Sequence, residues 1–257
     1  YLAETREATA EVTAKFTEGV EPGHRETVTL TDYDPLGEEK VVAAAMYASS
    51  NLPDDRLQSL AHTMSPDERD AVLSAYVGER GNRRHKPGRA FERTGYRFDV
   101  LCDYGAFRDL QRHRLLTLEW QRLSPEHGFD TPDVIADAGM IEEWNRVMED
   151  SAATWATLSE HAGEDVAQYS VAMAYRIRFV MQMSAREAMH LIELRSSPQG
   201  HPTYRRVAQQ MHDLIEKNAG HRAIARTMTY LDTSDVDLER LEAERRAEAK
   251  RKSARAG

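Results

Sequence analysis

The sequence contains one cysteine, Cys102, and its ten histidines form no HExxH pattern. A single cysteine cannot form a disulfide within the chain, so the expected compartment is a reducing cytoplasm. Histidine, cysteine and carboxylate residues are also not clustered at the short spacings that metal ions require. The sequence therefore argues against a metal site.

Three glycine- and serine-based motifs are also missing: the GxSxG elbow, the phosphate-cradling glycine loop and GxGxxG. Their absence argues against serine hydrolases, P-loop proteins and dinucleotide-binding folds of the Rossmann type. No apolar run approaches the roughly 18 residues of a membrane span. The first residues do not combine a charged and an apolar stretch, so no signal segment is expected.

The composition is that of a folded protein with a substantial core: 257 residues, 40% hydrophobic and 30% charged. The formal net charge of -9 argues against non-specific binding to nucleic acid, which depends on lysine and arginine. Two basic clusters, residues 80–93 and 245–257, depart from this average. A nucleic-acid-binding module using them ranks last among our hypotheses, because almost no aromatic residues interleave with their charges.

Hydrophobic periodicity predicts a mixture of helices and strands. Residues 95–102 alternate between apolar and polar side chains, which is typical of a half-buried strand. Ser65 and Glu68, with Pro66 between them, predict a capping box at the start of a helix. The predicted helices cover residues 1–20, 38–49, 65–78, a short segment from 104, a segment from 131, and residues 140–161, 184–195 and 202–218. Residues 116–120 are predicted to be extended, and residues 169–183 fit either a strand or a buried helix.

This pattern indicates an α+β fold with additions at both ends. We predict an N-terminal helix and linker over residues 1–30, a main domain over residues 31–231, and a charged helical or disordered tail over residues 232–257. Ser184 and Glu187 predict a second capping box, at the helix that carries Arg186, His190 and Arg195.

Arginine is the residue type that points to chemistry. The triplet Arg112, His113 and Arg114 lies at a predicted junction between a helix and a strand, where side chains are accessible to ligands. Arg178, Arg186 and Arg195 lie in structured, partly apolar segments, where an unpaired guanidinium is costly to bury. Each of these arginines requires an anion. Acidic neighbours such as Glu119, Glu187 and Glu193 could supply it, or the arginines could form a site for phosphate and a planar heterocycle.

Two blocks of sequence resemble the flavin-dependent thymidylate synthases, the ThyX family. The first block runs FRDLQRHR and then LLTLEWQRLS, and is similar to the family signature RHRxxSxNExSxRY. The second block, RIRFVMQMSAREAMHLIELR, is similar to a later family block of the approximate form RFFxxxNxRSxxxFLxLR. The resemblance covers residues 41–214 in order and spacing.

The resemblance implies a ThyX-like α+β fold with a central sheet surrounded by helices. It implies methylation of C5 of dUMP, or of a related uridine nucleotide, by a methylene unit from methylenetetrahydrofolate and a hydride from FAD, with NADPH as reductant. It also implies a homo-oligomer, because ThyX sites are built between the subunits of a tetramer.

The resemblance also implies roles for individual residues. Arg195 is the expected catalytic residue, because it matches an arginine that stabilises charge on the pyrimidine ring. The expected cofactor-binding residues are Arg112, His113, Arg114, Ser184, Arg186 and His190. The expected substrate-binding residues are Arg108, Asp109, Arg122, Ser124, Arg178 and Arg195.

The sequence departs from the family signature after the arginine-histidine-arginine triplet. Thr117, Glu119 and Trp120 replace the signature's serine, asparagine and glutamate. The signature's later serine and arginine are inverted as Arg122 and Ser124, which share one face if this stretch is extended. These changes leave open an alternative, a catalytically degenerate module that binds a nucleotide or has a structural role. Because the chain opens with Tyr1, we also expect it to be the C-terminal half of a tandem protein, forming a pseudo-dimer.

Overall fold

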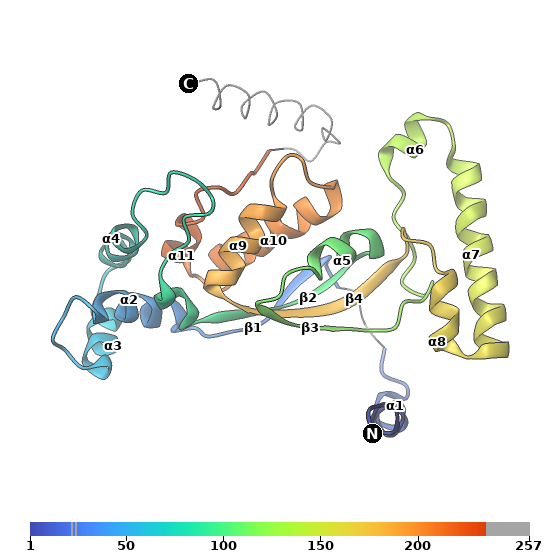
Figure 1. Ribbon diagram of the computed structural model, residues 1–257, viewed down its shortest axis with the longest axis horizontal. Coiled ribbons are helices and arrows are strands. Elements are labelled where there is room, and N and C mark those ends of the chain that lie inside the picture. Colours follow the sequence, from blue (N-terminus) through green and yellow to red (C-terminus); the bar gives the residue numbers. More distant parts are fainter. Residues whose placement is uncertain (22, 24, 235–257) are drawn as a thin grey trace.

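The computed structural model describes residues 1–21, 23 and 25–234. At its centre is a sheet of four antiparallel strands: β1 (Val28–Tyr33), β2 (Gly95–Asp103), β3 (Leu116–Trp120) and β4 (Arg176–Ser184). Their order in the sheet is β1-β2-β4-β3. Helices lie over one face of this sheet and at its two ends, so the predicted α+β fold is confirmed (Figure 1).

The strand β4 resolves the ambiguity that periodicity left at residues 169–183. It pairs with β2 along nine residues and with β3 along five, so its backbone groups are satisfied on both sides. Its odd-numbered residues from Ile177 to Met183 are buried, whereas Arg176, Arg178 and Gln182 point to the other face. The segment before it forms a short 3-10 helix, η2 (Gln168–Ser170).

Four helices lie over one face of the sheet: α5 (Tyr104–Leu110), α9 (Ala185–Arg195), α10 (Pro202–Lys217) and α11 (Arg222–Arg226) (Figure 1). The core forms between this layer and the sheet. Phe107 of α5 packs on Phe179 of β4 with ring centroids 4.8 Å apart. The helix α9 follows β4 directly, and so it is positioned by the central strand of the sheet.

A second group of helices packs beside the sheet: α2 (Gly37–Tyr47), α3 (Asp54–Thr63) and α4 (Pro66–Val77). The predicted capping box of α4 is confirmed, because the Ser65 N–H donates to the Glu68 carboxylate over 2.7 Å and the Glu68 N–H donates to the Ser65 hydroxyl over 3.3 Å. The sequence analysis did not predict α3, whose ten residues bury only Leu57 and Ala61.

The remaining helices extend from this body. The helices α6 (Asp133–Asp137), α7 (Ile141–Ala162) and α8 (Glu164–Ala167) form a projection at one end of the sheet (Figure 1). The helix α1 (Leu2–Thr17) has no buried residue. Among the described residues, no helix is both long and apolar enough to cross a membrane.

The predicted domain boundaries lie close to features of the fold. The strand β1 begins at Val28 and crosses the predicted boundary at residue 30. At the other end, Leu231 packs against the core, and the Asp232 N–H donates to the Ser196 hydroxyl over 3.1 Å. The predicted tail lies outside the described residues from 235 onward, as does the basic cluster 245–257. These boundaries therefore stay predictions.

Candidate functional site

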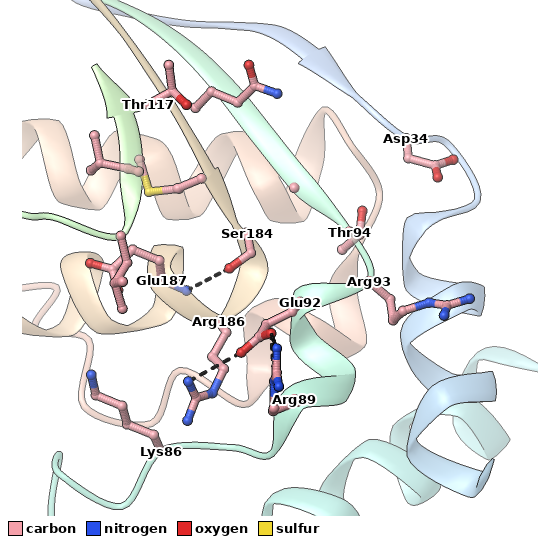
Figure 2. Close-up of a pocket in the computed structure, with 15 residues that line it drawn as sticks. Asp34, Lys86, Arg89, Glu92, Arg93, Thr94, Thr117, Ser184, Arg186 and Glu187 are labelled. Carbon is pink, nitrogen blue, oxygen red and sulfur yellow. Dashed lines mark hydrogen bonds and ion pairs between the residues drawn. The ribbon is translucent and has the colours of Figure 1, made fainter.

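Two adjoining cavities lie where β4 passes into α9. The larger has a volume of about 910 Å³ and is lined by the ends of β2, β3 and β4 and by the 3-10 helix η1 (Arg89–Glu92) (Figure 2). The smaller has a volume of about 310 Å³ and is lined by α9 and by residues 112–115. Lys86, Leu115 and Glu187 line both cavities. These volumes are in the range of small-molecule sites.

The chain reaches this site twice, from two distant segments. The helix α5 ends at Leu110, and the following turn carries the arginine-histidine-arginine triplet to the start of β3. The second segment is α9, which begins much later in the chain, at Ala185. The smaller cavity brings together the residues predicted from both blocks: Arg112, His113, Arg114, His190 and Arg195. Ser184 and Arg186 line the larger cavity.

The predicted second capping box is only half formed. The Glu187 N–H donates to the Ser184 hydroxyl over 3.4 Å, as the pattern predicts. The Glu187 carboxylate, however, contacts Nδ1 of His113 over 3.1 Å and makes no described hydrogen bond to the Ser184 backbone. The prediction of a complete box was wrong, because a buried imidazole lies within reach of this carboxylate.

A buried chain of hydrogen bonds connects Glu187, His113 and Arg195. Arg195 Nε–H donates to Nε2 of His113 over 3.1 Å, so Nε2 must carry a lone pair. The proton of a neutral imidazole then lies on Nδ1, which donates to Glu187. His113 and Glu187 are both buried. The network thus assigns a single neutral tautomer to His113.

Other contacts of Arg195 hold its guanidinium in place. Its two terminal nitrogens donate to the side chain and to the backbone carbonyl of Asp109. The guanidinium carbon lies 5.3 Å from the centre of the Tyr204 ring. Since a guanidinium has five N–H bonds, these contacts leave part of its donor capacity for a ligand.

His113, Glu187 and His190 offer ligand atoms that lie within 4.8 Å of one another, a spacing that could suit a metal ion. The charges around them oppose a divalent cation, because Lys86, Arg114 and Arg195 line the same cavity. Burial lowers the pKa of His190, and the charge of Lys86 lowers it further. Another possible group, His212, Asp213 and Glu216, lies on α10. The argument against a metal site stays a prediction.

A carboxylate lies between two arginines in the larger cavity. Glu92 accepts from Arg89 Nε over 2.9 Å and from Arg186 over 3.5 Å (Figure 2). The hydrogen bond from Arg89 lowers the pKa of Glu92, and the charge of Arg186 lowers it further. Arg186 also donates from Nε to the Pro87 carbonyl over 2.9 Å. Arg186 is therefore fixed at the cavity wall.

Two cations of the site have no partner among the described residues. Lys86 and Arg114 are exposed, and no hydrogen bond or ion pair within residues 1–21, 23 and 25–234 engages their side chains. By contrast, Arg112 pairs with Asp109 over 3.3 Å. An anionic ligand would meet Lys86 and Arg114 without having to displace an internal carboxylate.

Of the six predicted substrate-binding residues, five line neither cavity: Arg108, Asp109, Arg122, Ser124 and Arg178. Arg178 lies on the sheet face opposite α9, where it pairs with Asp99 over 3.4 Å. Arg122 pairs with Glu164 over 2.8 Å at α8. The Ser124 hydroxyl accepts from the Glu126 N–H over 3.3 Å. The strand β3 ends at Trp120, so Arg122 and Ser124 lie beyond it.

Arg108, also predicted to bind substrate, contacts a methionine of another segment. Its guanidinium lies 3.3 Å from Sδ of Met173, outside both cavities. The sequence analysis also missed Lys86 as a site residue. The signal was present in the basic cluster 80–93, which was interpreted only as a possible nucleic-acid surface.

Comparison with known proteins identifies a family and several relatives of this chain. Residues 29–219 match the family described as "Thymidylate synthase complementing protein". A UPF0159 protein of Chlamydia pneumoniae is 37% identical over 86% of this chain and 41% of its own length. A UPF0159 protein of Thermoplasma acidophilum is 38% identical over 91% of this chain and 46% of its own length. This chain thus spans about half the length of these curated relatives.

A solved structure has a similar fold. The UMP/dUMP methylase PolB from Streptomyces cacaoi, bound with 5-Br dUMP, matches with a TM-score of 0.60. The match covers 78% of this chain and 94% of the PolB chain, with 20% sequence identity. At this identity the likeness supports the shared fold.

Proposed function

Because this chain belongs to the thymidylate synthase complementing protein family, the ThyX family, we propose that its two cavities bind a uridine nucleotide and a flavin. The proposed reaction is methylation of C5 of dUMP, or of a related uridine nucleotide, with methylenetetrahydrofolate and NADPH as co-substrates. One observation supports this proposal most strongly. Residues from both sequence blocks, 112–114 and 184–195, line adjoining cavities. The UMP/dUMP methylase with a similar fold supports the substrate class.

The residues present fit FAD, which the family implies. The larger cavity has the volume for a sizeable ligand, and the unpaired Lys86 and Arg114 offer donors to a diphosphate. Ser184 at the end of β4 and Arg186 and His190 of α9 would hold the cofactor from one side. Arg112, His113 and Arg114 would hold it from the turn before β3. When bound, the flavin supplies the hydride of the reaction.

The proposed role of Arg195 is to stabilise negative charge on the pyrimidine ring during methyl transfer. Its hydrogen bonds to His113 and Asp109 orient the guanidinium before a ligand arrives, and such preorganised donors are an effective form of electrostatic catalysis. Arg178, Arg122 and Ser124 line neither of the two cavities, so the proposed site within one chain does not include them. Arg178 lies on the other sheet face, from which it could reach a site on a neighbouring chain.

Ion pairing favours a second candidate, a module that binds nucleotides without turnover. Asp109 engages both Arg112 and Arg195, and Asp99 engages Arg178. These carboxylates would compete with an anionic ligand. If the chain is half of a longer protein, the module could complete a site on a second half or on another copy. We propose an oligomeric assembly in a reducing cytoplasm for either candidate.

The first test is flavin uptake and turnover by the purified protein, both as this chain and, if the chain is half of a longer protein, as that longer protein. We expect a bound-flavin absorbance spectrum, and NADPH oxidation that depends on dUMP and yields the C5-methylated nucleotide by mass spectrometry. Arg195→Lys should abolish methylation, whereas Arg122→Gln should not alter it. Protein that binds dUMP but shows no methylation in either form would establish the second candidate. Protein that binds neither flavin nor dUMP would contradict both.

A further inference from the structure

The basic loop, residues 80–88, is anchored at its start by a buried ion pair. Arg80 NH2 donates to the Glu193 carboxylate of α9 over 2.6 Å, and the two side chains are only 3% and 0% exposed. Arg80 also donates to the Thr227 carbonyl over 3.2 Å, and the Tyr230 hydroxyl donates to the Arg80 carbonyl. The loop therefore begins from a rigid point next to the helix that lines both cavities.

The residues on either side of Lys86 are also held. Arg80 Nε donates to the His85 carbonyl over 2.7 Å, and the Gly81 N–H donates to His85 Nδ1 over 3.2 Å. On the other side, the Pro87 carbonyl accepts from Arg186 over 2.9 Å, and Pro87 is buried. The backbone at Lys86 is thus fixed before a ligand binds.

The Lys86 side chain extends from this fixed backbone into the cavity region (Figure 2). It lines both cavities, and its amine has no partner in the described part of the chain. Arg114, the other unpaired cation, lines the smaller cavity with it. Of the three residues that line both cavities, only Glu187 has a carboxylate, and this carboxylate is engaged by His113. The positive charge of Lys86 is therefore not neutralised where the two cavities meet.

Three of the other cations of the sequence cluster 80–93 are used internally. Arg80 is buried, Arg89 pairs with Glu92 over 2.9 Å, and Arg93 pairs with Asp54 over 3.1 Å. A surface for a nucleic-acid backbone needs many free cations in a row, and these pairs remove several of them. The arrangement fits a discrete phosphate better than a polymer.

We propose that Lys86 binds a phosphate group of the nucleotide or dinucleotide ligand at the junction of the two cavities. The ligand class rests on the proposed function, whereas the site itself rests on the anchored loop and its free amine. A lysine ammonium is a compact charge with three donors and suits a phosphate oxygen. Because the loop is already ordered, binding need not order the backbone. The phosphate could belong to the uridine nucleotide or to the flavin dinucleotide.

The test compares wild type, Lys86→Gln and Lys86→Arg by calorimetry, using inorganic pyrophosphate as the probe. Lys15→Gln, an exposed charge on α1, is the matched control. We expect Lys86→Gln to weaken pyrophosphate binding about tenfold, the effect of one charge-assisted hydrogen bond. Lys86→Arg should retain most of the affinity, and Lys15→Gln should match wild type. Circular dichroism checks that every variant is folded.

Paired ligands then identify the source of the phosphate. If the phosphate belongs to the substrate, Lys86→Gln weakens dUMP and spares deoxyuridine. If it belongs to the cofactor, the same variant weakens FAD and spares riboflavin. Equal binding of pyrophosphate, dUMP and FAD by wild type and Lys86→Gln, or no pyrophosphate binding by wild type, would overturn the inference. Lys86-dependent binding of pyrophosphate without binding of flavin or dUMP would sustain it and contradict the proposed function.

Discussion

At the scale of the residue, Glu187 could complete either of two hydrogen-bond patterns. Its carboxylate could return to the backbone at Ser184, as Glu68 returns to Ser65, or it could accept from His113. The second pattern satisfies a buried imidazole, and an unsatisfied buried donor would cost more than an open helix end. This choice determines the tautomer of His113 and, through it, the partner of Arg195.

Glu187→Gln tests this chain of residues. The amide can donate as well as accept, so His113 should lose its single tautomer and the Arg195 guanidinium its fixed orientation. We expect the ¹⁵N shifts of His113 to report a mixed tautomer, and dUMP affinity to fall about three- to tenfold, equivalent to one neutral hydrogen bond. Glu68→Gln, which lies in the α4 cap and away from the site, is the control. Unchanged His113 shifts would show that the carboxylate does not select the tautomer.

The Arg80–Glu193 pair permits a prediction on stability. Glu193→Gln should leave the buried guanidinium without its counter-charge and destabilise the fold by about 3–5 kcal/mol. The measurement is the free energy of unfolding from urea denaturation. Asp213→Asn, which breaks the exposed pair with Lys217, should change it little. If Glu193→Gln lowers the free energy of unfolding by no more than Asp213→Asn does, then solvent reaches Arg80.

At the scale of the element, local signals explain the helices and strands that the sequence predicts well. The Ser65 capping box and the alternation in residues 95–102 reproduce α4 and β2 within a residue or two, because caps and period-two patterns act locally. Helix α3 was missed because no side chain caps its start, so it has no local signal like the Ser65 capping box. Residues 176–184 form a strand because neighbours on both sides pair with them, and periodicity within the segment cannot show this.

Helix α11 depends on a carboxylate from another element. Glu38 of α2 accepts from the Ala223 N–H over 2.7 Å and from the Ile224 N–H over 3.3 Å. Burial raises the pKa of Glu38, although these hydrogen bonds and Arg69 act in the opposite direction and Asp70 adds to the rise. A raised folded-state pKa means that protonated Glu38 favours folding at low pH. This contribution is lost as the pH rises through the folded-state pKa.

Glu38→Gln should therefore gain stability relative to wild type as the pH rises. The glutamine oxygen can still accept from Ala223, and the variant avoids burying a charge. We expect the difference in unfolding free energy to move in favour of the variant between about pH 4 and pH 7. Urea denaturation at several pH values measures it, with the exposed Glu26→Gln as control. A difference independent of pH would show that Glu38 keeps an ordinary pKa.

At the scale of the whole molecule, the net charge and the site have opposite signs. The chain carries a formal charge of -9, yet the smaller cavity is lined by Lys86, Arg112, Arg114 and Arg195 against the single carboxylate of Glu187. The excess negative charge resides elsewhere on the surface. Such a distribution favours the entry of an anion at the cavities while the protein as a whole repels polyanions.

The helix α1 has no buried residue, which suggests that it adds little to the stability of the domain. Deletion of residues 1–26, which leaves β1 intact, should shift the melting temperature by less than about 2 °C. Scanning calorimetry measures the shift in the isolated chain. A larger loss would mean that this helix docks on the domain in solution and would refute the predicted boundary near residue 30.

The sequence by itself determined the family, the α+β class, and most helices and strands, because each depends on local patterns or on blocks of contiguous residues. It also identified candidate site residues that line a cavity: Arg186 lines the larger one, and His113, Arg114 and Arg195 line the smaller one. Only the tertiary structure decided which cations are free. Pairing partners such as Asp109 for Arg195, Glu164 for Arg122 and Asp99 for Arg178 depend on how distant elements meet. Electrostatic pairing acts over a few ångströms in space, and separation along the chain does not reveal it.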